Sequence, residues 1–298
     1  MHKRWRYSPK LYYVKSYLHS VSGIAFNDAI AKKKKLASQT LSFNEFNTLY
    51  KQKYNTTLDP DWLGWFVGFA EGDGYLGINK DIIVFVLTQK EAKILYEVRD
   101  TLKFGYVKEF DGFYRYIVRN QSDMLLLFRL FNGNLHFLSK IDQLVAWEKL
   151  LNSKNKGNQV KAITKPVELS LNNSWFSGFV DAEGCFNVYV AKNDKAVSLR
   201  FIVDQKDGTF FFNDLKHILK RGSIYSRKNN NARYAVSNLT SLSLIINYFN
   251  QFTLRTKKRL AFVKWVNIYN CVLNKEHKSP EGIAKIKALS KLVNQDND

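Results

Sequence analysis

Two acidic residues, Asp73 and Glu183, stand at matching places in two similar segments and are the residues best suited to chemistry. The first segment is "WFVGFAEGDGYLGI" at 65–78, and the second is "WFSGFVDAEGCFNV" at 175–188. Each acid closes an apolar stretch, and another acid stands two residues before it. Carboxylate oxygens are the ligands that Mg²⁺ prefers in proteins. The two segments therefore predict a divalent-cation site, provided that folding brings the two acids together.

Small residues recur every fourth position in both segments, so they lie on one face of a predicted helix. They are Gly64, Gly68 and Gly72 in the first segment and Ser174, Gly178 and Ala182 in the second. A glycine inside a helix costs about 1 kcal/mol relative to alanine, and close approach of two helix backbones can offset that cost. We expect the two helices to pack through Gly64, Gly68, Ser174 and Gly178. The C-terminal ends of the helices then meet, and their dipoles add to the attraction for a cation.

The similarity between the two halves continues along the chain. "TQKE" at 88–91 matches "DQKD" at 204–207, which pairs Gln89 with Gln205. "LSKIDQLVAW" at 138–147 matches "TKKRLAFVKW" at 256–265, which pairs Lys140 with Lys258. Since the matches keep their order, they indicate an internal duplication.

Each copy has the pattern of an α+β unit, in which helices back an antiparallel sheet. Two alternating hairpin patterns follow each apolar segment. The hairpins turn near 79–81 and 111–112 in the first copy, and at 192–195 and 229–231 in the second. Helical patterns cover 124–131, 141–151, 242–249 and 259–272. We place the first repeat at 59–151, a polar linker at 152–170, the second repeat at 171–298 and a basic N-terminal extension at 1–58.

The net charge is +20, with 46 Lys and Arg against 26 Asp and Glu. This charge favours a polyanionic partner, with nucleic acid first. It is concentrated in the extension and the second repeat. No apolar run reaches the roughly 18 residues that span a bilayer, so no membrane partner is expected. Cys185 and Cys271 cannot form a disulfide framework, and the composition is typical of an AT-rich genome.

The motifs "GFAEGDG" and "GFVDAEG" resemble the paired motifs of single-chain LAGLIDADG homing endonucleases. The resemblance extends from residue 59 to about 293 and includes "SPEGIAKIK" at 279–287. It implies two pseudo-symmetric αββαββα units, with the motif helices packed at the centre and the antiparallel sheets forming a DNA-binding saddle. It also implies a monomer that cuts both strands of a long, non-palindromic DNA site with a divalent metal and leaves 3′ overhangs. With the AT-rich composition, it points to an intron-encoded protein of an organelle, above all the mitochondrion.

The resemblance also implies a role for each site residue. The metal would be held by two carboxylates, assisted by two backbone carbonyls, and would activate the attacking water. Mg²⁺ is the expected cation, with Mn²⁺ and Ca²⁺ as further cations that could bind. Two lysines would stabilise the scissile phosphates, and two glutamines would position water. These residues are Asp73 and Glu183, the carbonyls of Gly72 and Ala182, Lys140 and Lys258, and Gln89 and Gln205.

Other interpretations of these residues stay open. The two motif acids could be solvated helix ends of a degenerate motif, the lysines ordinary residues at a helix start, and Gln89 a polar residue at a strand end. Glu71 and Asp181 are expected to support or cap the helix ends. Trp147 and Trp265 are expected to anchor the core, and Cys185 to pack near the site.

Base readout is expected from the polar faces of the strands, because a two-stranded ribbon fits the major groove of DNA. Some of the side chains on these faces would contact only phosphate. The nominated residues are Tyr75, Asn79, Lys108, Arg115 and Arg119 in the first copy, and Asn187, Tyr189, Ser198, Arg200, Tyr225, Arg227, Arg233 and Ser237 in the second.

The extension at 1–58 lies outside the resemblance and carries "AKKKKLA" at 31–37. It could supply phosphate contacts, or it could be upstream reading-frame sequence without a role. The strongest competing function is an intron RNA maturase on the same scaffold, which would bind intron RNA. A second alternative is a DNA-binding regulator that does not cleave. Intact acids at both motifs favour the nuclease and leave a dual role open.

Overall fold

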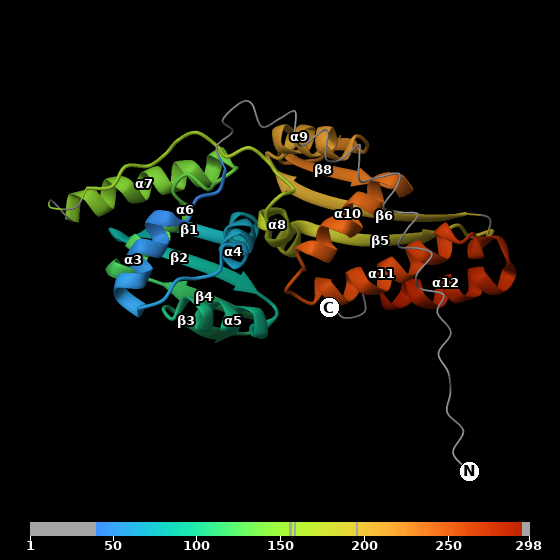
Figure 1. The fold of residues 1–298 in the computed structure, drawn as a ribbon, viewed down its shortest axis with the longest axis horizontal. Helices are drawn as coiled ribbons and strands as arrows, with labels where there is room; N and C mark the ends of the chain where they lie inside the picture. The colour runs from blue at the N-terminus through green and yellow to red at the C-terminus, as the bar shows by residue number, and fades with distance from the viewer. Residues whose placement is uncertain (1–39, 155–156, 158, 195, 294–298) are drawn as a thin grey trace, which may run out of the picture. The chain divides into compact units, whose positions relative to one another are not determined.

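The computed structural model describes residues 40–293 except 155, 156, 158 and 195. These residues form two similar α+β units (Figure 1). The first unit contains α3 (Asn44–Tyr54), α4 (Pro60–Asp73), β1 (Gly74–Asn79), β2 (Ile82–Gln89), α5 (Ala92–Leu102), β3 (Tyr106–Phe110), β4 (Phe113–Val118), α6 (Gln121–Phe131) and α7 (Leu138–Lys154). The second contains α8 (Trp175–Glu183), β5 (Gly184–Val190), β6 (Val197–Lys206), α9 (Thr209–Leu219), β7 (Ser223–Ser226), β8 (Asn231–Val236), α10 (Leu239–Gln251), α11 (Lys258–Leu273), η1 (Glu276–Lys278) and α12 (Pro280–Leu292).

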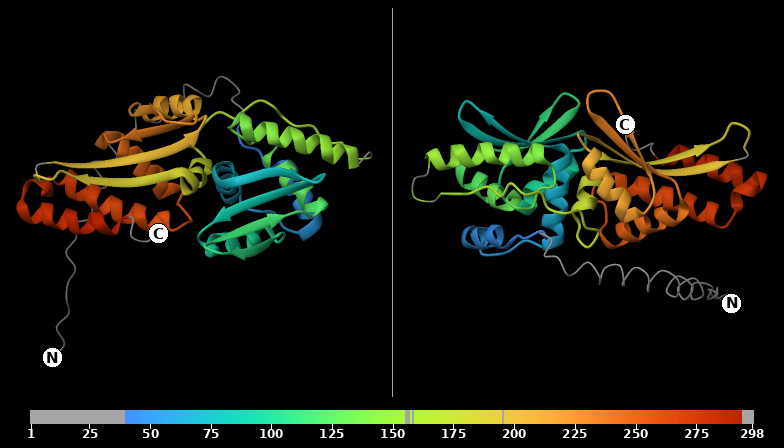
Figure 2. Two further views of the ribbon diagram at one scale, coloured as in Figure 1. Left: turned by 180° about the vertical axis from the view of Figure 1, so that it is seen from behind. Right: turned by 90° about the horizontal axis from the view of Figure 1, so that it is seen from above.

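The two sheets have the same topology. Their strand orders are β1-β2-β4-β3 and β5-β6-β8-β7, and all neighbouring strands are antiparallel. Helices pack on one face of each sheet, as the right-hand view of Figure 2 shows. The predicted antiparallel sheets backed by helices are confirmed.

The hairpin turns are largely those predicted. Lys80 and Asp81 join β1 to β2 with φ of 48° and 61°, the left-handed conformation that a two-residue hairpin turn requires. Asp111 and Gly112 join β3 to β4. The last hairpin turns slightly earlier than predicted, because Asn231 already begins β8.

Matched tryptophans anchor each sheet to the helix behind it. Trp147 and Trp265 are fully buried. The indole nitrogen of Trp147 donates to the carbonyl of Gly77 (3.1 Å), and that of Trp265 donates to the carbonyl of Asn187 (3.2 Å). The predicted role of both residues as core anchors is confirmed.

Two helices, α5 and α9, were not among the helices predicted above, although the αββαββα order requires a helix at each place. Apolar residues recur at helical spacing in both of them. Two helices follow the sheet in both units, α6 and α7 in the first and α10 and α11 in the second. The second unit continues with η1 and α12. No helix among the described residues combines the length and the apolar character needed to cross a membrane.

The described part of the predicted N-terminal extension packs onto the first unit. In α3, Phe46 and Tyr50 are fully buried, and the Tyr50 hydroxyl donates to the carbonyl of Thr101 (3.2 Å). Lys53 forms an ion pair with Asp123. The compact unit therefore starts at Thr40 rather than at residue 59, because an aromatic face of α3 completes the core. Residues 1–39, with the basic run at 31–37, lie outside the described residues.

The predicted linker is ordered where it is described. α7 continues to Lys154, and Val160, Ala162 and Val167 are buried. The amide of Ala162 donates to the carboxylate of Glu148 (2.9 Å). This segment is therefore part of the packed structure despite its polar composition.

Candidate metal centre and nucleic-acid interface

The motif helices α4 and α8 pack backbone to backbone. A Cβ atom at Gly68 would collide with the carbonyl oxygen of Trp175, and one at Gly178 would collide with that of Trp65. Gly64 faces Ser174, whose hydroxyl donates to the carbonyl of Asp61. The structure thus places the four predicted interface residues in one contact between the units.

Asp73 is the last residue of α4, and Glu183 is the last residue of α8. Burial raises the pKa of Glu183 to about 7, and the charge of Asp73 adds to the rise. Burial also raises the pKa of Asp73, against the opposing effect of a hydrogen bond from Gln89 (Nε2–Oδ2, 2.5 Å). A cation bound next to two half-buried carboxylates is stabilised, because it relieves the repulsion between their charges.

The donor set fits a magnesium ion. Mg²⁺ keeps several waters and binds through one or two carboxylates plus substrate phosphates, which is what Asp73 and Glu183 could offer. Among the described residues, no group of three or more His, Cys, Asp and Glu side chains could hold a metal. Backbone carbonyls, water or phosphate would therefore complete the coordination. In this structure the carbonyl of Ala182 accepts from Lys258 (2.6 Å), so as a metal ligand it would have to give up that bond or share it.

The two lysines occupy matching places beside the acids. Lys140 lies in the first turn of α7 and donates to the carbonyl of Gly74. Lys258 begins α11 and donates to the carbonyls of Val180 (3.2 Å) and Ala182 (2.6 Å). Burial lowers the pKa of both lysines, whereas the charges of the motif acids oppose that shift. Both ammonium groups therefore lie within the field of both carboxylates.

The two glutamines are not equivalent. Gln89 bonds Asp73, as described above. The Oε1 atom of Gln205 is buried and has no hydrogen-bond partner among the residues that the structure describes. A buried amide oxygen without a donor costs free energy, so the Oε1 atom of Gln205 is free to accept a hydrogen bond from a water or another donor.

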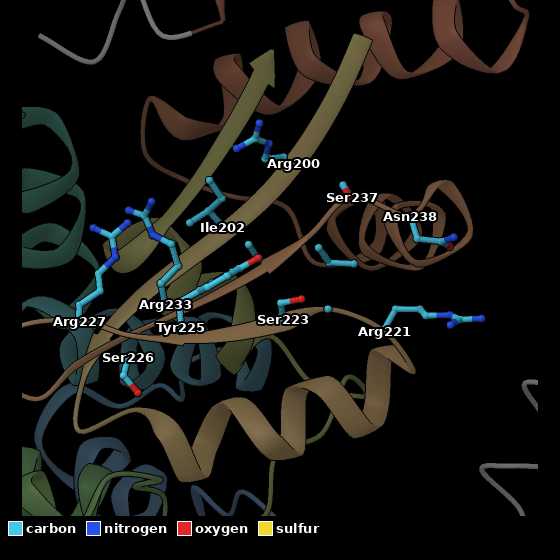
Figure 3. Close-up of a pocket in the computed structure, with 13 residues that line it drawn as sticks. Arg200, Ile202, Arg221, Ser223, Tyr225, Ser226, Arg227, Arg233, Ser237 and Asn238 are labelled. Atoms are coloured by element: carbon cyan, nitrogen blue, oxygen red, sulfur yellow. The ribbon is translucent and has the colours of Figure 1, made fainter. Parts of the chain in front are cut away.

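The second sheet presents a concave, basic face (Figure 3). The lining includes Arg200, Arg221 and Arg227. Arg200 lies over the ring of Tyr189, with 5.5 Å from the guanidinium carbon to the ring centroid. Arg233 forms a bidentate ion pair with Asp204 (2.7 and 2.6 Å), so part of its charge is neutralised. Among the other nominated residues of this copy, Tyr225 and Ser237 line the face and Asn187 and Ser198 are half-buried.

The first sheet presents a different face. Tyr75, Asn79, Lys108 and Arg119 are exposed there. Arg115 lies beside two stacked aromatic rings, with its guanidinium carbon 5.0 Å from the centroid of Phe110 and 5.1 Å from that of Phe113. Its Nε atom is buried and unbonded in the described part of the chain. The predicted readers of this sheet are therefore fewer than those of the second, although each set contains three basic residues.

Sequence reasoning missed Asp204 and Arg221 on the second sheet. Asp204 pairs with Arg233 across β6 and β8, a register between non-consecutive strands that no local sequence pattern indicates. Cys185 lies near the site as expected, since the charge of Lys258 opposes the rise that burial causes in the pKa of its thiol, but the residue is exposed on β5.

Comparison with known proteins gives relatives named after introns, among them endonucleases and an RNA maturase. The model of the LAGLIDADG endonuclease family matches residues 176–269. "Probable intron-encoded endonuclease 4" of Neurospora crassa is 36% identical over 249 residues, which are 80% of this chain and 45% of that protein. "Intron-encoded RNA maturase bI4" of Saccharomyces cerevisiae is 33% identical over 131 residues, 42% of this chain and 19% of that protein. The chain thus spans less than half of the length of these two relatives.

Solved structures share the fold. The LAGLIDADG homing endonuclease I-LtrWI, bound to target DNA, has a TM-score of 0.62 at 20% identity and covers 78% of this chain and 97% of its own. I-SmaMI, bound to an uncleaved DNA target in the presence of calcium ions, has a TM-score of 0.59 at 20% identity, with 80% and 99% covered. Two α+β units joined through paired motif helices define the LAGLIDADG fold. The second unit thus matches the LAGLIDADG endonuclease family over residues 176–269, and the described chain shares the fold of solved LAGLIDADG endonucleases.

Proposed function

We propose that this protein is a site-specific DNA endonuclease that cuts both strands of a long, non-palindromic duplex and leaves 3′ overhangs. The observation that carries the proposal is the meeting of Asp73 and Glu183 at the ends of two packed helices, each with a lysine beside it. The relatives named intron-encoded endonucleases support the same activity. One chain supplies both acids, so we propose that it acts as a monomer.

In the proposed mechanism, Asp73 and Glu183 would hold Mg²⁺, and the ion would supply activation of the attacking water and stabilisation of the leaving oxygen. Lys140 and Lys258 each stabilise the charge that develops on one scissile phosphate. Gln89 orients the Asp73 carboxylate through its hydrogen bond. The sheet faces bind the two half-sites, and the second sheet supplies most of the positive charge.

We also propose that the protein is encoded within an intron and acts in an organelle, the mitochondrion first. The relatives named as intron-encoded support this origin. An RNA maturase is the second candidate, because one relative of 33% identity carries that name.

The test is cleavage of a DNA library that spans the uninterrupted host locus, in Mg²⁺. Discrete double-strand cuts with 3′ overhangs are expected, and both Asp73→Asn and EDTA should abolish them while binding persists. Asp142→Asn, on an exposed position of α7, is the matched control and should cut normally. DNA binding without cleavage by the unmodified protein would favour the regulator, and preferential binding of the intron RNA would favour the maturase.

A further inference from the structure

The acid two residues before each motif acid is buried and fully engaged. Glu71 is 1% exposed. Its Oε1 atom accepts from the amides of His136 and Phe137 (2.9 Å each), and its Oε2 atom accepts from the indole nitrogen of Trp175 (2.8 Å). A carboxylate buried with several donors is stabilised by charge-assisted hydrogen bonds. This residue therefore fixes the backbone just before α7.

Asp181 does the same in the second unit. It is 3% exposed. Its Oδ2 atom accepts from the amide of Arg255 (2.7 Å) and from the indole nitrogen of Trp65 (2.8 Å), and its Oδ1 atom accepts from the hydroxyl of Thr256 (2.6 Å). Here the carboxylate fixes the backbone just before α11.

Each fixed segment leads directly to a lysine of the site. The amide of Lys140 donates to the carbonyl of Phe137 (3.0 Å). The amide of Lys258 donates to the hydroxyl of Thr256 (3.2 Å). A shift in either segment would therefore displace the ammonium group of the lysine that follows.

The tryptophan in each set comes from the other unit. Trp65 on α4 donates to Asp181 on α8, and Trp175 on α8 donates to Glu71 on α4. Both indoles are buried. The imidazole of His136 lies against Trp175, with ring centroids 4.0 Å apart. Each set thus joins one motif helix, the opposite motif helix and one lysine.

We propose that Glu71 and Asp181 are positioning residues, each of which sets the lysine of its own unit against the scissile phosphate of one DNA strand. Glu71 with Trp175 positions Lys140, and Asp181 with Trp65 positions Lys258. This inference rests on the proposed nuclease function. The inference has a consequence for each DNA strand. Disturbing the contacts of Glu71 or of Asp181 should slow the cut of one DNA strand more than the cut of the other.

The test follows the two strands separately in single-turnover cleavage of an end-labelled duplex by the full chain. Lys140→Met and Lys258→Met first assign each lysine to a strand. Glu71→Gln and Trp175→Phe should then slow the Lys140 strand by about tenfold or more, since small misplacements of a catalytic group are costly. Asp181→Asn and Trp65→Phe should slow the other strand, and nicked duplex should accumulate in each case.

The matched control is Trp62→Phe. Trp62 is also buried in α4, but its indole nitrogen has no hydrogen-bond partner in the described part of the chain. This variant should leave the ratio of the two strand rates unchanged. Binding to DNA in Ca²⁺, measured in parallel, should change less than about threefold in every variant, because none of these residues lies on the sheet faces.

Equal slowing of both strands, or slowing of the strand assigned to the other lysine, would overturn the inference while leaving the nuclease intact. If the amide variants do not fold, the two Trp→Phe variants decide, because they keep an aromatic ring in place. A wild-type protein that cleaves no DNA would instead refute the proposed function, and this inference with it.

Discussion

Asn187 and Arg200 on the second sheet correspond in register to Gly77 and Val84 on the first. The two sheets share strand order and pairing, but these places carry a hydrogen-bonding pair in one and an apolar pair in the other. Arginine can read guanine through two hydrogen bonds, whereas apolar side chains contact mainly the thymine methyl group. Two sheets with the same backbone topology therefore carry different side chains at corresponding places.

The difference continues across the whole width of the sheets. The row Tyr75, Val86, Ile117 and Tyr106 crosses the first sheet. The corresponding row of the second sheet is Cys185, Ile202, Ala235 and Ser223. Large apolar and aromatic side chains thus cover the first face, while smaller ones leave the arginines of the second face accessible. We infer that the second half-site is read more stringently than the first.

The largest effects are expected where the two halves are alike. Asp73→Asn and Glu183→Gln should each slow cleavage by roughly a thousandfold, because metal stabilisation is worth several kcal/mol and each ~1.4 kcal/mol is tenfold. Single-turnover rates and binding in Ca²⁺ measure the loss. Substantial cleavage by one variant but not the other would mean that the asymmetry of the faces extends into the metal site.

The helix pair offers a second symmetric comparison. Gly68→Ala and Gly178→Ala should each destabilise the fold by about 1–3 kcal/mol or more, since each new methyl meets backbone atoms of the opposite helix. Thermal unfolding measures both. Gly157→Ala is the control, because a Cβ there meets nothing within 4 Å. A much smaller loss at one of the two motif glycines would show that the helices can separate at that end.

Base specificity should distinguish the halves. Arg200→Ala should cost about 1–3 kcal/mol of discrimination at one base pair of the second half-site. The check is to measure binding to every single-base variant of the target, before and after the mutation. We expect larger summed penalties in the second half-site for the unmodified protein, and equal penalties in the two halves would contradict the comparison.

The smallest expected effect is on nonspecific DNA binding, and it concerns the residues paired with Arg233 and Arg115. Asp204 on β6 holds Arg233, whereas the first sheet has Thr88 at the corresponding place beside Arg115. Asp204→Thr should free one positive charge, tighten nonspecific binding and steepen its salt dependence by about one unit. Titrations at several salt concentrations test this, with Asp207→Asn, at an exposed position directly after β6, as the control. An unchanged slope would mean that Arg233 does not reach phosphate.

Much of the fold could be predicted because the duplicated motifs are local in sequence. The strand alternation around 185–203 and the turn at Asp111 and Gly112 follow from short-range rules. The packing of Gly68 against the opposite helix could also be predicted from the sequence, because small residues at every fourth position form a face that a second backbone can approach closely. Helices α5 and α9 were also predictable, since their apolar residues recur at helical spacing. Helix α3 was assigned to the extension because that segment is basic, although the buried face of α3 is aromatic.

The sequence by itself determined the duplication, the helix pair and the identity of the two motif acids, because each depends on spacing along one segment. Only the tertiary structure decided that Trp65 and Trp175 cross between units to Asp181 and Glu71. It also decided that Arg233 is tied to Asp204 while Gln205 lacks a bond within the described residues. Such contacts join residues far apart in the chain, and their partners are fixed by how whole helices and strands pack, which no local pattern encodes.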